Sequence, residues 1–204
     1  MPQGVNLIAL DGQVTIQTNA DFADHWLKDR TQDPGTRQSL FLLAGNNIVQ
    51  GLQFHDIDKK TYPNTIPKGA LSPGAGALWL AGSNVTITQN RFDDMYHGIG
   101  AEKESTFTDP GLGVNPYAGV FGYANVVITE NMFGVYWEPI HLNGALEDSI
   151  IARNTFWLGA SAATLALGVA GSRHLDVSTN TVDGTQTKYS QGLVGWRAGF
   201  FFPL

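Results

Sequence analysis

The chain contains no cysteine and few charged residues, and each of these features excludes some classes of function. Without cysteine there is no disulfide framework and no thiolate metal site. Charged residues make up 15% of the 204 residues, the formal net charge is −6, and the longest basic run is Lys59 and Lys60. A nucleic-acid partner is therefore not expected. The apolar runs are too short for a membrane span or a signal peptide, so no membrane partner is expected either.

Glycine and apolar residues are plentiful. The chain has 24 glycines and 43% hydrophobic residues, a mixture that favours β-structure with many turns. The length suits a single domain, residues 1–204, with a continuous core. Both ends are apolar, "GVNLIAL" and "RAGFFFPL". We therefore expect a fragment of a larger chain, or ends covered by a partner or a second copy of this chain.

A repeat occupies the middle of the sequence. Its units read apolar-x-apolar, two polar residues, Asn, any residue, and then Phe or Val. The four units are "NVTITQNRF" (84–92), "NVVITENMF" (125–133), "DSIIARNTF" (148–156) and "RHLDVSTNTV" (173–182), and "NNIVQGLQF" (46–54) is a fifth without the asparagine. The closing residues Phe54, Phe92, Phe133, Phe156 and Val182 are separated by 38, 41, 23 and 26 residues.

The shorter separations match one coil of a parallel β-helix, a solenoid of roughly 20–30 residues per coil. The longer ones add inserted loops at about 59–76 and 104–119, both rich in Pro and Gly. Within each unit, alternate residues such as Val85 and Ile87 should point inward. The repeated asparagines should form a hydrogen-bonded ladder inside the coils. Its members are Asn90, Asn131, Asn154 and Asn180.

The fold class predicted is therefore all-β, a right-handed parallel β-helix with inserted loops. The alternative is a β-sandwich. Hairpin signals such as Asn-Gly at regular spacing would favour a sandwich, and the repeat units do not contain them. One amphipathic stretch, "ADFADHWLKDR" (20–30), predicts a short helix.

The pattern resembles the pectin-lyase-like β-helix superfamily over about residues 5–195. "NNIVQGLQFHDID" is similar to an early coil of pectate lyases, and "GALWLAGSNVTITQNRFDDMYHG" and "NVVITENMFGVYWEPIHLNG" are similar to later ones. The resemblance implies a polysaccharide substrate and a secreted or cell-surface location. Thr88 and Gln89 stand where pectate lyases carry a calcium-binding aspartate, and "GVYWEPI" stands where they carry a His-x-x-Lys stretch. Calcium ligands and the family's arginine base are therefore not carried over; no cofactor is predicted, and calcium is left open.

Residues at equal distances after the closing phenylalanine should fall on neighbouring coils, about 4.8 Å apart. The residues four and five positions on are Asp58, Lys59, Tyr96, His97, Trp137 and Glu138. His141, between Ile140 and Leu142, should project outward beside them. Lys60 follows Lys59 and would meet an anionic ligand on the same side of the coils.

This group suits proton abstraction from a uronic acid. His97, Tyr96 or Lys59 would take the proton α to the carboxylate, and a cation would neutralise the developing charge. Hydrolysis by Asp94 and Glu138 is an alternative, because glycoside hydrolases use two carboxyl groups about 5–10 Å apart. For each residue a structural role is also open: Asp93 and Asp94 are typical turn residues, and Lys59 and Lys60 suit a solvated surface.

Trp79, Trp137 and Trp157 are predicted to face outward, where they would either stack on sugar rings or pack beneath loops. His25, His55 and His174 are interpreted as structural or surface residues. The function predicted is a carbohydrate-active protein that binds an extended polysaccharide along the coil face, as a uronate lyase or epimerase. The alternative from a different class is a non-catalytic β-helix, a glycan-binding or structural stalk such as part of a phage tailspike.

Overall fold

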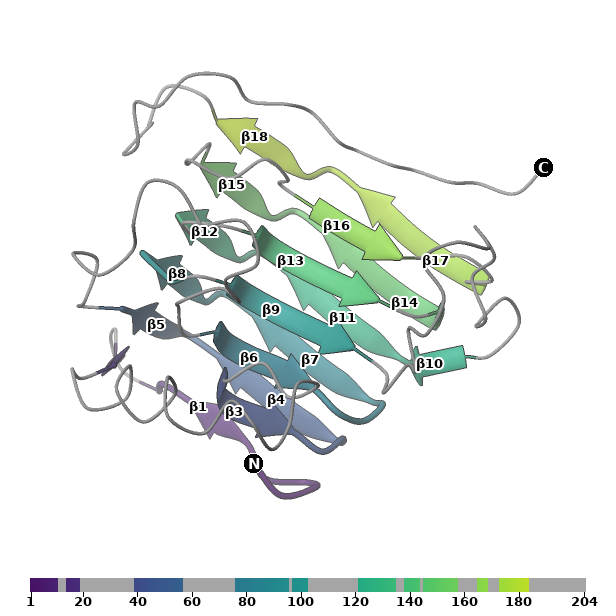
Figure 1. Cartoon of the computed structure of the whole chain (residues 1–204), viewed down its shortest axis with the longest axis horizontal. Coiled ribbons are helices and arrows are strands. Elements are labelled where there is room, and N and C mark those ends of the chain that lie inside the picture. The colour runs from purple at the N-terminus through teal and green to yellow at the C-terminus, as the bar shows by residue number, and fades with distance from the viewer. Residues whose placement is uncertain are drawn as a thin grey trace, which may run out of the picture.

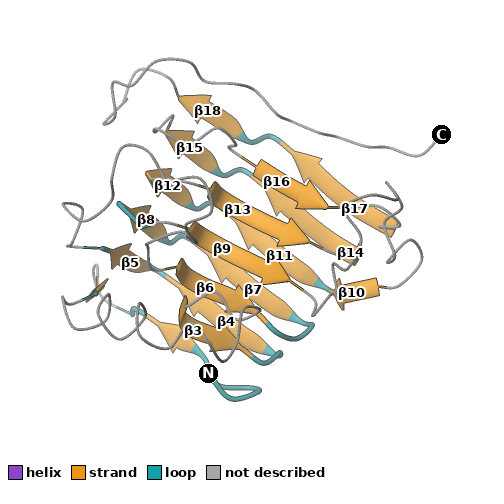
Figure 2. Ribbon diagram, viewed as in Figure 1, coloured by secondary structure: helices purple, strands orange, loops and turns teal. Residues whose placement is uncertain are grey.

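The computed structural model is built from β-strands, and no helix lies among the residues it describes (Figures 1 and 2). The all-β class predicted from composition is confirmed. The helix expected at 20–30 and nearly all of both loop insertions lie outside the described residues. The structure describes residues 1–10, 14–18, 39–56, 76–95, 97–102, 121–134, 138–143, 145–157, 165–168 and 173–183.

The strands form three sheets, and neighbouring strands within each sheet pair in parallel throughout the described residues. Sheet A holds β1 (Leu7–Ile8), β4 (Asn47–Gln50), β7 (Val85–Thr88), β10 (Phe121–Ala124), β11 (Val126–Thr129), β14 (Ala145–Ala152) and β17 (Arg173–Ser178). Sheet B holds β2 (Val14–Gln17), β5 (Leu52–His55), β8 (Arg91–Asp93), β12 (Met132–Gly134), β15 (Thr155–Trp157) and β18 (Thr181–Asp183). Sheet C holds β3 (Ser39–Leu43), β6 (Gly76–Leu80), β9 (His97–Glu102), β13 (Glu138–Asn143) and β16 (Leu165–Gly168).

Consecutive strands visit the three sheets in turn, except that β10 and β11 both belong to sheet A. The chain passes from β4 through β5 to β6, one strand in each sheet. The next three strands follow the same path, so that β7 pairs with β4, β8 with β5 and β9 with β6. We call one passage through sheets A, B and C a circuit. Figure 1 shows the strands of successive circuits side by side, from β1 near the N-terminus to β18. Residues 38 or 41 positions apart in the sequence thereby become neighbours, as Gln53 and Arg91 do.

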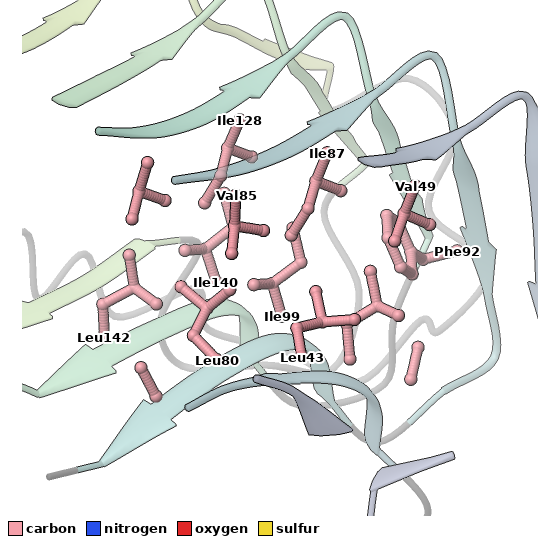
Figure 3. Close-up of a cluster of buried hydrophobic side chains, with 14 of the residues drawn as sticks. Leu43, Val49, Leu80, Val85, Ile87, Phe92, Ile99, Ile128, Ile140 and Leu142 are labelled. Carbon is pink, nitrogen blue, oxygen red and sulfur yellow. The ribbon is translucent and has the colours of Figure 1, made fainter. Parts of the chain in front are cut away.

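Strand alternation sets the core, as the repeat predicted. In β7, Val85 and Ile87 are buried while Thr86 and Thr88 are partly exposed. The inward residues of sheets A and C meet in the space between the sheets, where Figure 3 shows Val85, Ile87 and Ile128 facing Ile99 and Ile140. The core is therefore continuous from one circuit to the next.

The closing phenylalanines of the repeat stack on one another on the core side of sheet B. The centroids of Phe54 and Phe92 are 5.1 Å apart, those of Phe92 and Phe133 4.8 Å, and those of Phe133 and Phe156 5.1 Å, with near-parallel rings. Each of these four side chains is at most 2% exposed. Identical rings one strand spacing apart fill the corner of the core without gaps.

The predicted asparagine ladder is present at the corner between sheets A and B. Asn90, Asn131 and Asn154 are buried, and Asn180 closes the series. Each Oδ1 accepts the backbone N–H of the preceding asparagine, at 2.9–3.0 Å. In the circuit without an asparagine, the backbone N–H of Leu52 donates to Oδ1 of Asn90 at 3.1 Å.

Two further columns of residues turn the chain by adopting positive φ. Residues of the first column lie where the chain enters sheet A, and residues of the second lie where it leaves sheet A. In both columns the members are separated by the same numbers of residues as the closing phenylalanines. The first column is Asn46, Asn84, Asn125, Asp148 and His174, and the second is Gly51, Gln89, Glu130, Arg153 and Thr179. Asparagine, aspartate and glycine tolerate this left-handed backbone best, which explains much of the first column.

Candidate functional site at the corner between sheets B and C

Three carboxylates are buried where the chain leaves sheet B for sheet C. Asp56 follows β5, Asp93 ends β8 and Asp94 follows it, and each residue is only 2–3% exposed. Buried carboxylates are costly unless they are hydrogen-bonded or paired with a charge. Their partners therefore define the chemistry of this corner, which we call the B–C corner.

Asp56 is held by hydrogen bonds to the circuits on both sides of it. The hydroxyl of Thr18 donates to its Oδ1 at 2.5 Å, and its backbone N–H donates to the carbonyl of Asp93 at 3.3 Å. Thr18 itself is buried and its N–H donates to the carbonyl of His55. The contacts of Thr18 join the first circuit to the second at this corner, and the N–H of Asp56 joins the second circuit to the third.

Asp93 lies in a row of outward residues on sheet B. Its Oδ2 accepts from Nε of Arg91 at 2.5 Å and from Nε2 of Gln53 at 2.8 Å. The guanidinium of Arg91 lies 4.8 Å from the ring centroid of Trp157, a cation–π contact. The indole packs over Gly134, where a Cβ would come within 2.9 Å of the ring. A side chain at position 134 would displace Trp157 and with it the contact to Arg91.

Asp94 faces a histidine from the preceding circuit. Oδ2 of Asp94 lies 3.8 Å from Nδ1 of His55, an ion-pair distance when the imidazole is protonated. Asp94 has φ +59° and its N–H donates to the carbonyl of Gly134 at 3.0 Å. The positive φ agrees with the turn role considered for Asp94, but its carboxylate is buried and directed at another side chain rather than solvated.

Strand pairing in sheet C brings two of the predicted site residues together. Glu138 is the register partner of His97, and His97 also pairs with Gly76. The equal spacing from Phe92 and Phe133 predicted this pairing. His141 pairs with Gly100 and Ala166, three positions further along β13. For His97, Glu138 and His141 the structure describes the backbone.

The side chain of Trp79 is buried rather than exposed. Its side chain is only 4% exposed, and its ring lies against Gly100 of the neighbouring strand β9, where a Cβ would come within 2.4 Å of Cε3 and Cζ3. Trp79 is absent from the apolar core that contains Leu78 and Leu80, in keeping with strand alternation. The expectation of an exposed indole ready for a sugar ring is therefore wrong for Trp79.

The remaining predicted site residues are not placed. They are Asp58, Lys59, Lys60, Tyr96 and Trp137, which lie outside the described residues. The chemistry assigned to them, and to His97, Glu138 and His141, stays a prediction.

Sequence analysis did not predict the contact of His55 with Asp94 or that of Arg91 with Asp93 and Trp157. These residues could have been found from their distance in sequence to the closing phenylalanine of each unit. One position before it stand Gln53 and Arg91, and one position after it stand His55, Asp93 and Trp157. Applying the count to these adjacent positions would have aligned them on the outer face of sheet B.

The described residues include no group of three His, Asp or Glu side chains arranged to hold a metal ion. Of the three corner carboxylates, Asp56 accepts from Thr18 and Asp93 from Arg91 and Gln53. Calcium, left open above, is assigned no ligand in this part of the chain. In the same residues there is no helix long and apolar enough to cross a membrane.

Comparison with known proteins adds no relative. No protein-family model matches the chain, and no curated protein or solved structure matches it.

Proposed function

We propose that the three sheets form a right-handed parallel β-helix of the pectin-lyase-like kind, and that it binds an extended polysaccharide across its circuits at the B–C corner. Support for the β-helix comes from the parallel pairing and from the regular visit to sheets A, B and C. Successive strands lie about 4.8 Å apart, so a chain molecule crossing them meets equivalent positions of several circuits. A secreted or cell-surface location is part of the same proposal.

The chemistry proposed is proton abstraction from a uronate, in a lyase or an epimerase. The observation that carries it is the register of His97 with Glu138 at the first residues of β9 and β13, with His97 three residues after the buried Asp94 in the chain. His97 would take the proton α to the carboxylate of the sugar, with Tyr96 and Lys59 as the other candidate bases. Elimination of the 4-linked oxygen then gives a lyase, and return of a proton from the opposite face gives an epimerase.

The test is ultraviolet absorbance during incubation with pectate, alginate and hyaluronan, each with and without calcium. A lyase forms an unsaturated uronate, which absorbs where the intact polymer does not. We expect a rise with one polymer and its loss in His97→Ala. His174→Ala is the matched control, because His174 is exposed in the column that turns into sheet A. Absence of a rise with every polymer would exclude a lyase acting on these substrates.

A non-catalytic β-helix is the second candidate, and one observation favours it. The described acids of the B–C corner have side-chain neighbours within the protein, as in a purely structural network. A glycan-binding stalk would keep its affinity in His97→Ala and His141→Ala and lose it in Trp137→Ala. Hydrolysis by Asp94 and Glu138, the remaining alternative, would release reducing ends without ultraviolet absorbance.

A covering partner at the first circuit is also proposed. Among the described residues, five of the seven exposed large hydrophobic side chains belong to this circuit. They are Val5, Ile8, Leu10, Val14 and Leu42. Edge strands with exposed apolar side chains tend to pair with further chain. The mass of the protein in solution, measured by light scattering, distinguishes a second copy of this chain from a monomer.

A further inference from the structure

The imidazole of His55 is held in an unusual way. Its Nδ1 is buried and makes no hydrogen bond, and the nearest ionisable partner is Oδ2 of Asp94 at 3.8 Å. The side chain of His55 is 28% exposed and that of Asp94 is 4% exposed. One nitrogen of the ring is therefore turned into the protein toward a carboxylate, while the ring as a whole reaches solvent.

A buried polar atom without a hydrogen bond is uncommon in native proteins, and a catalytic role is one of the explanations for it. Catalytic hydrogen bonds are also frequently long before a substrate binds and shorten in the complex. A carboxylate can only accept, so an approach of Asp94 to Nδ1 requires the proton of the neutral ring to sit on Nδ1. Nε2 then carries the lone pair.

The second ring nitrogen is available for a ligand. Within the described residues Nε2 of His55 has no hydrogen bond and is not among the buried unpaired atoms. A histidine with one nitrogen oriented by a carboxylate and the other open to a reacting group is the arrangement used for proton transfer in hydrolases. Gln17 and Asp93 flank His55 in the row on sheet B, and Asp56 follows it in the chain.

The other described histidine–aspartate pair differs in each of these respects. Nδ1 of His174 and Oδ1 of Asp148 are 2.8 Å apart, and the two side chains are 79% and 58% exposed. The pair belongs to the column that turns the chain into sheet A, away from the B–C corner. Exposed pairs of this kind contribute little, so it supplies a matched control.

We propose that His55 exchanges a proton with the bound polysaccharide through Nε2, and that Asp94 is the positioning residue that holds the imidazole. This rests on the proposed function. In the lyase reaction His97 takes the proton from C5, and the bond between C4 and the glycosidic oxygen breaks as the C4–C5 double bond forms. His55, doubly protonated at the start of this step, gives its Nε2 proton to that oxygen and is left as the neutral Nδ1–H form. His55 keeps its Nδ1 proton throughout.

The position of the proton can be measured without a substrate. In protein labelled with ¹⁵N-histidine, two-dimensional ¹H–¹⁵N spectra at a pH where the rings are neutral distinguish the Nδ1–H from the Nε2–H form. His55→Gln identifies the signal. We expect the wild-type His55 to be Nδ1–H, and Asp94→Asn to shift it toward Nε2–H, because the amide can donate to Nδ1. Asparagine tolerates the positive φ of position 94, so this variant keeps the turn. Asp148→Asn should change the signal of His174 alone.

Turnover supplies the second measurement. His55→Gln and Asp94→Asn should lower kcat on the polymer by roughly 10²–10⁴-fold with little change in KM, and Asp148→Asn should not. An Nε2–H form of wild-type His55, or a form that Asp94→Asn leaves unchanged, would overturn the pair. Full activity of His55→Gln would overturn the proton transfer. A wild-type protein with the Nδ1–H form and no activity on any polymer would overturn the proposed function and the donor role together, and would leave the orientation of His55 by Asp94 standing.

Discussion

Asn90 and Asn131 are joined by two hydrogen bonds to a single oxygen. Oδ1 of Asn131 accepts the backbone N–H of Asn90 at 3.0 Å and its Nδ2 at 3.1 Å. Nδ2 of Asn131 in turn donates to the carbonyl of Ile87 at 2.9 Å and to Oδ1 of Asn154 at 3.0 Å. The amide of Asn131 thus satisfies backbone groups at a turn that is closed to water, in addition to linking adjacent circuits.

Replacing Asn131 by alanine should lower the free energy of unfolding by about 2–6 kcal/mol. The N–H of Asn90 and the carbonyl of Ile87 would each lose a partner, and each buried group left without one costs about 1–3 kcal/mol. The measurement is the urea midpoint and slope of the variant against the wild type.

Asn84→Gly is the matched control for the ladder. Asn84 is exposed, and its side chain bonds only to Asn46 and Asn125 on the surface. Glycine accommodates its φ of +58°. The free energy of unfolding should change by no more than about 0.5 kcal/mol. Equal losses in the two variants would contradict the role assigned to the buried ladder.

Phe133→Ala should destabilise the protein by about 3–5 kcal/mol, because the ring is fully buried between Phe92 and Phe156 and its removal leaves a cavity. Met132→Ala, one position earlier and 37% exposed, should cost less than about 1 kcal/mol. Thermal unfolding followed by circular dichroism compares them. A similar loss from both would show that the stacked rings are not the dominant contact of sheet B.

Gly100→Ala should displace the indole of Trp79 and cost about 1–3 kcal/mol, since the new Cβ would lie 2.4 Å from the ring. The fluorescence spectrum should change with it. In a Trp79→Ala background the same substitution should cost under about 0.5 kcal/mol, because the contact has gone. Additive losses in the double-mutant cycle would mean that Gly100 is required for another reason.

Burial raises the pKa of the Tyr123 phenol above its ordinary value of 10.0. The folded protein therefore holds this proton where the unfolded chain releases it. The stabilisation is complete below about pH 10 and is lost as pH rises through the higher pKa of the folded state. In Tyr123→Phe the free energy of unfolding should decrease less steeply with pH than in the wild type between about pH 9 and about pH 11. Parallel stability curves would contradict this assignment.

The inner side of the fold was predictable because it repeats. The spacing of Phe54, Phe92, Phe133 and Phe156 aligns the strands of sheet B, and the same count pairs His97 with Glu138. An inward position meets its own equivalent on the next circuit, so sequence alone identifies the contact. The asparagine ladder followed from the same rule.

The outer side was less predictable because its contacts depend on unlike residues. Trp79 is covered in part because its register neighbour is Gly100, which leaves room for the indole. His55 meets Asp94, which is not its register partner, across the B–C corner. Such contacts depend on side-chain conformation at a turn, which the repeat does not specify.

The most direct test of the account follows the C5 proton of the uronate. Each polymer is incubated with the protein in D₂O and its proton NMR spectrum is recorded with time. A lyase and an epimerase both remove this proton, so the account predicts loss of the C5–H signal with one polymer, abolished in His97→Ala. Retention of the signal in every polymer would contradict proton abstraction and leave a binding or structural protein, or a hydrolase, as the remaining alternatives.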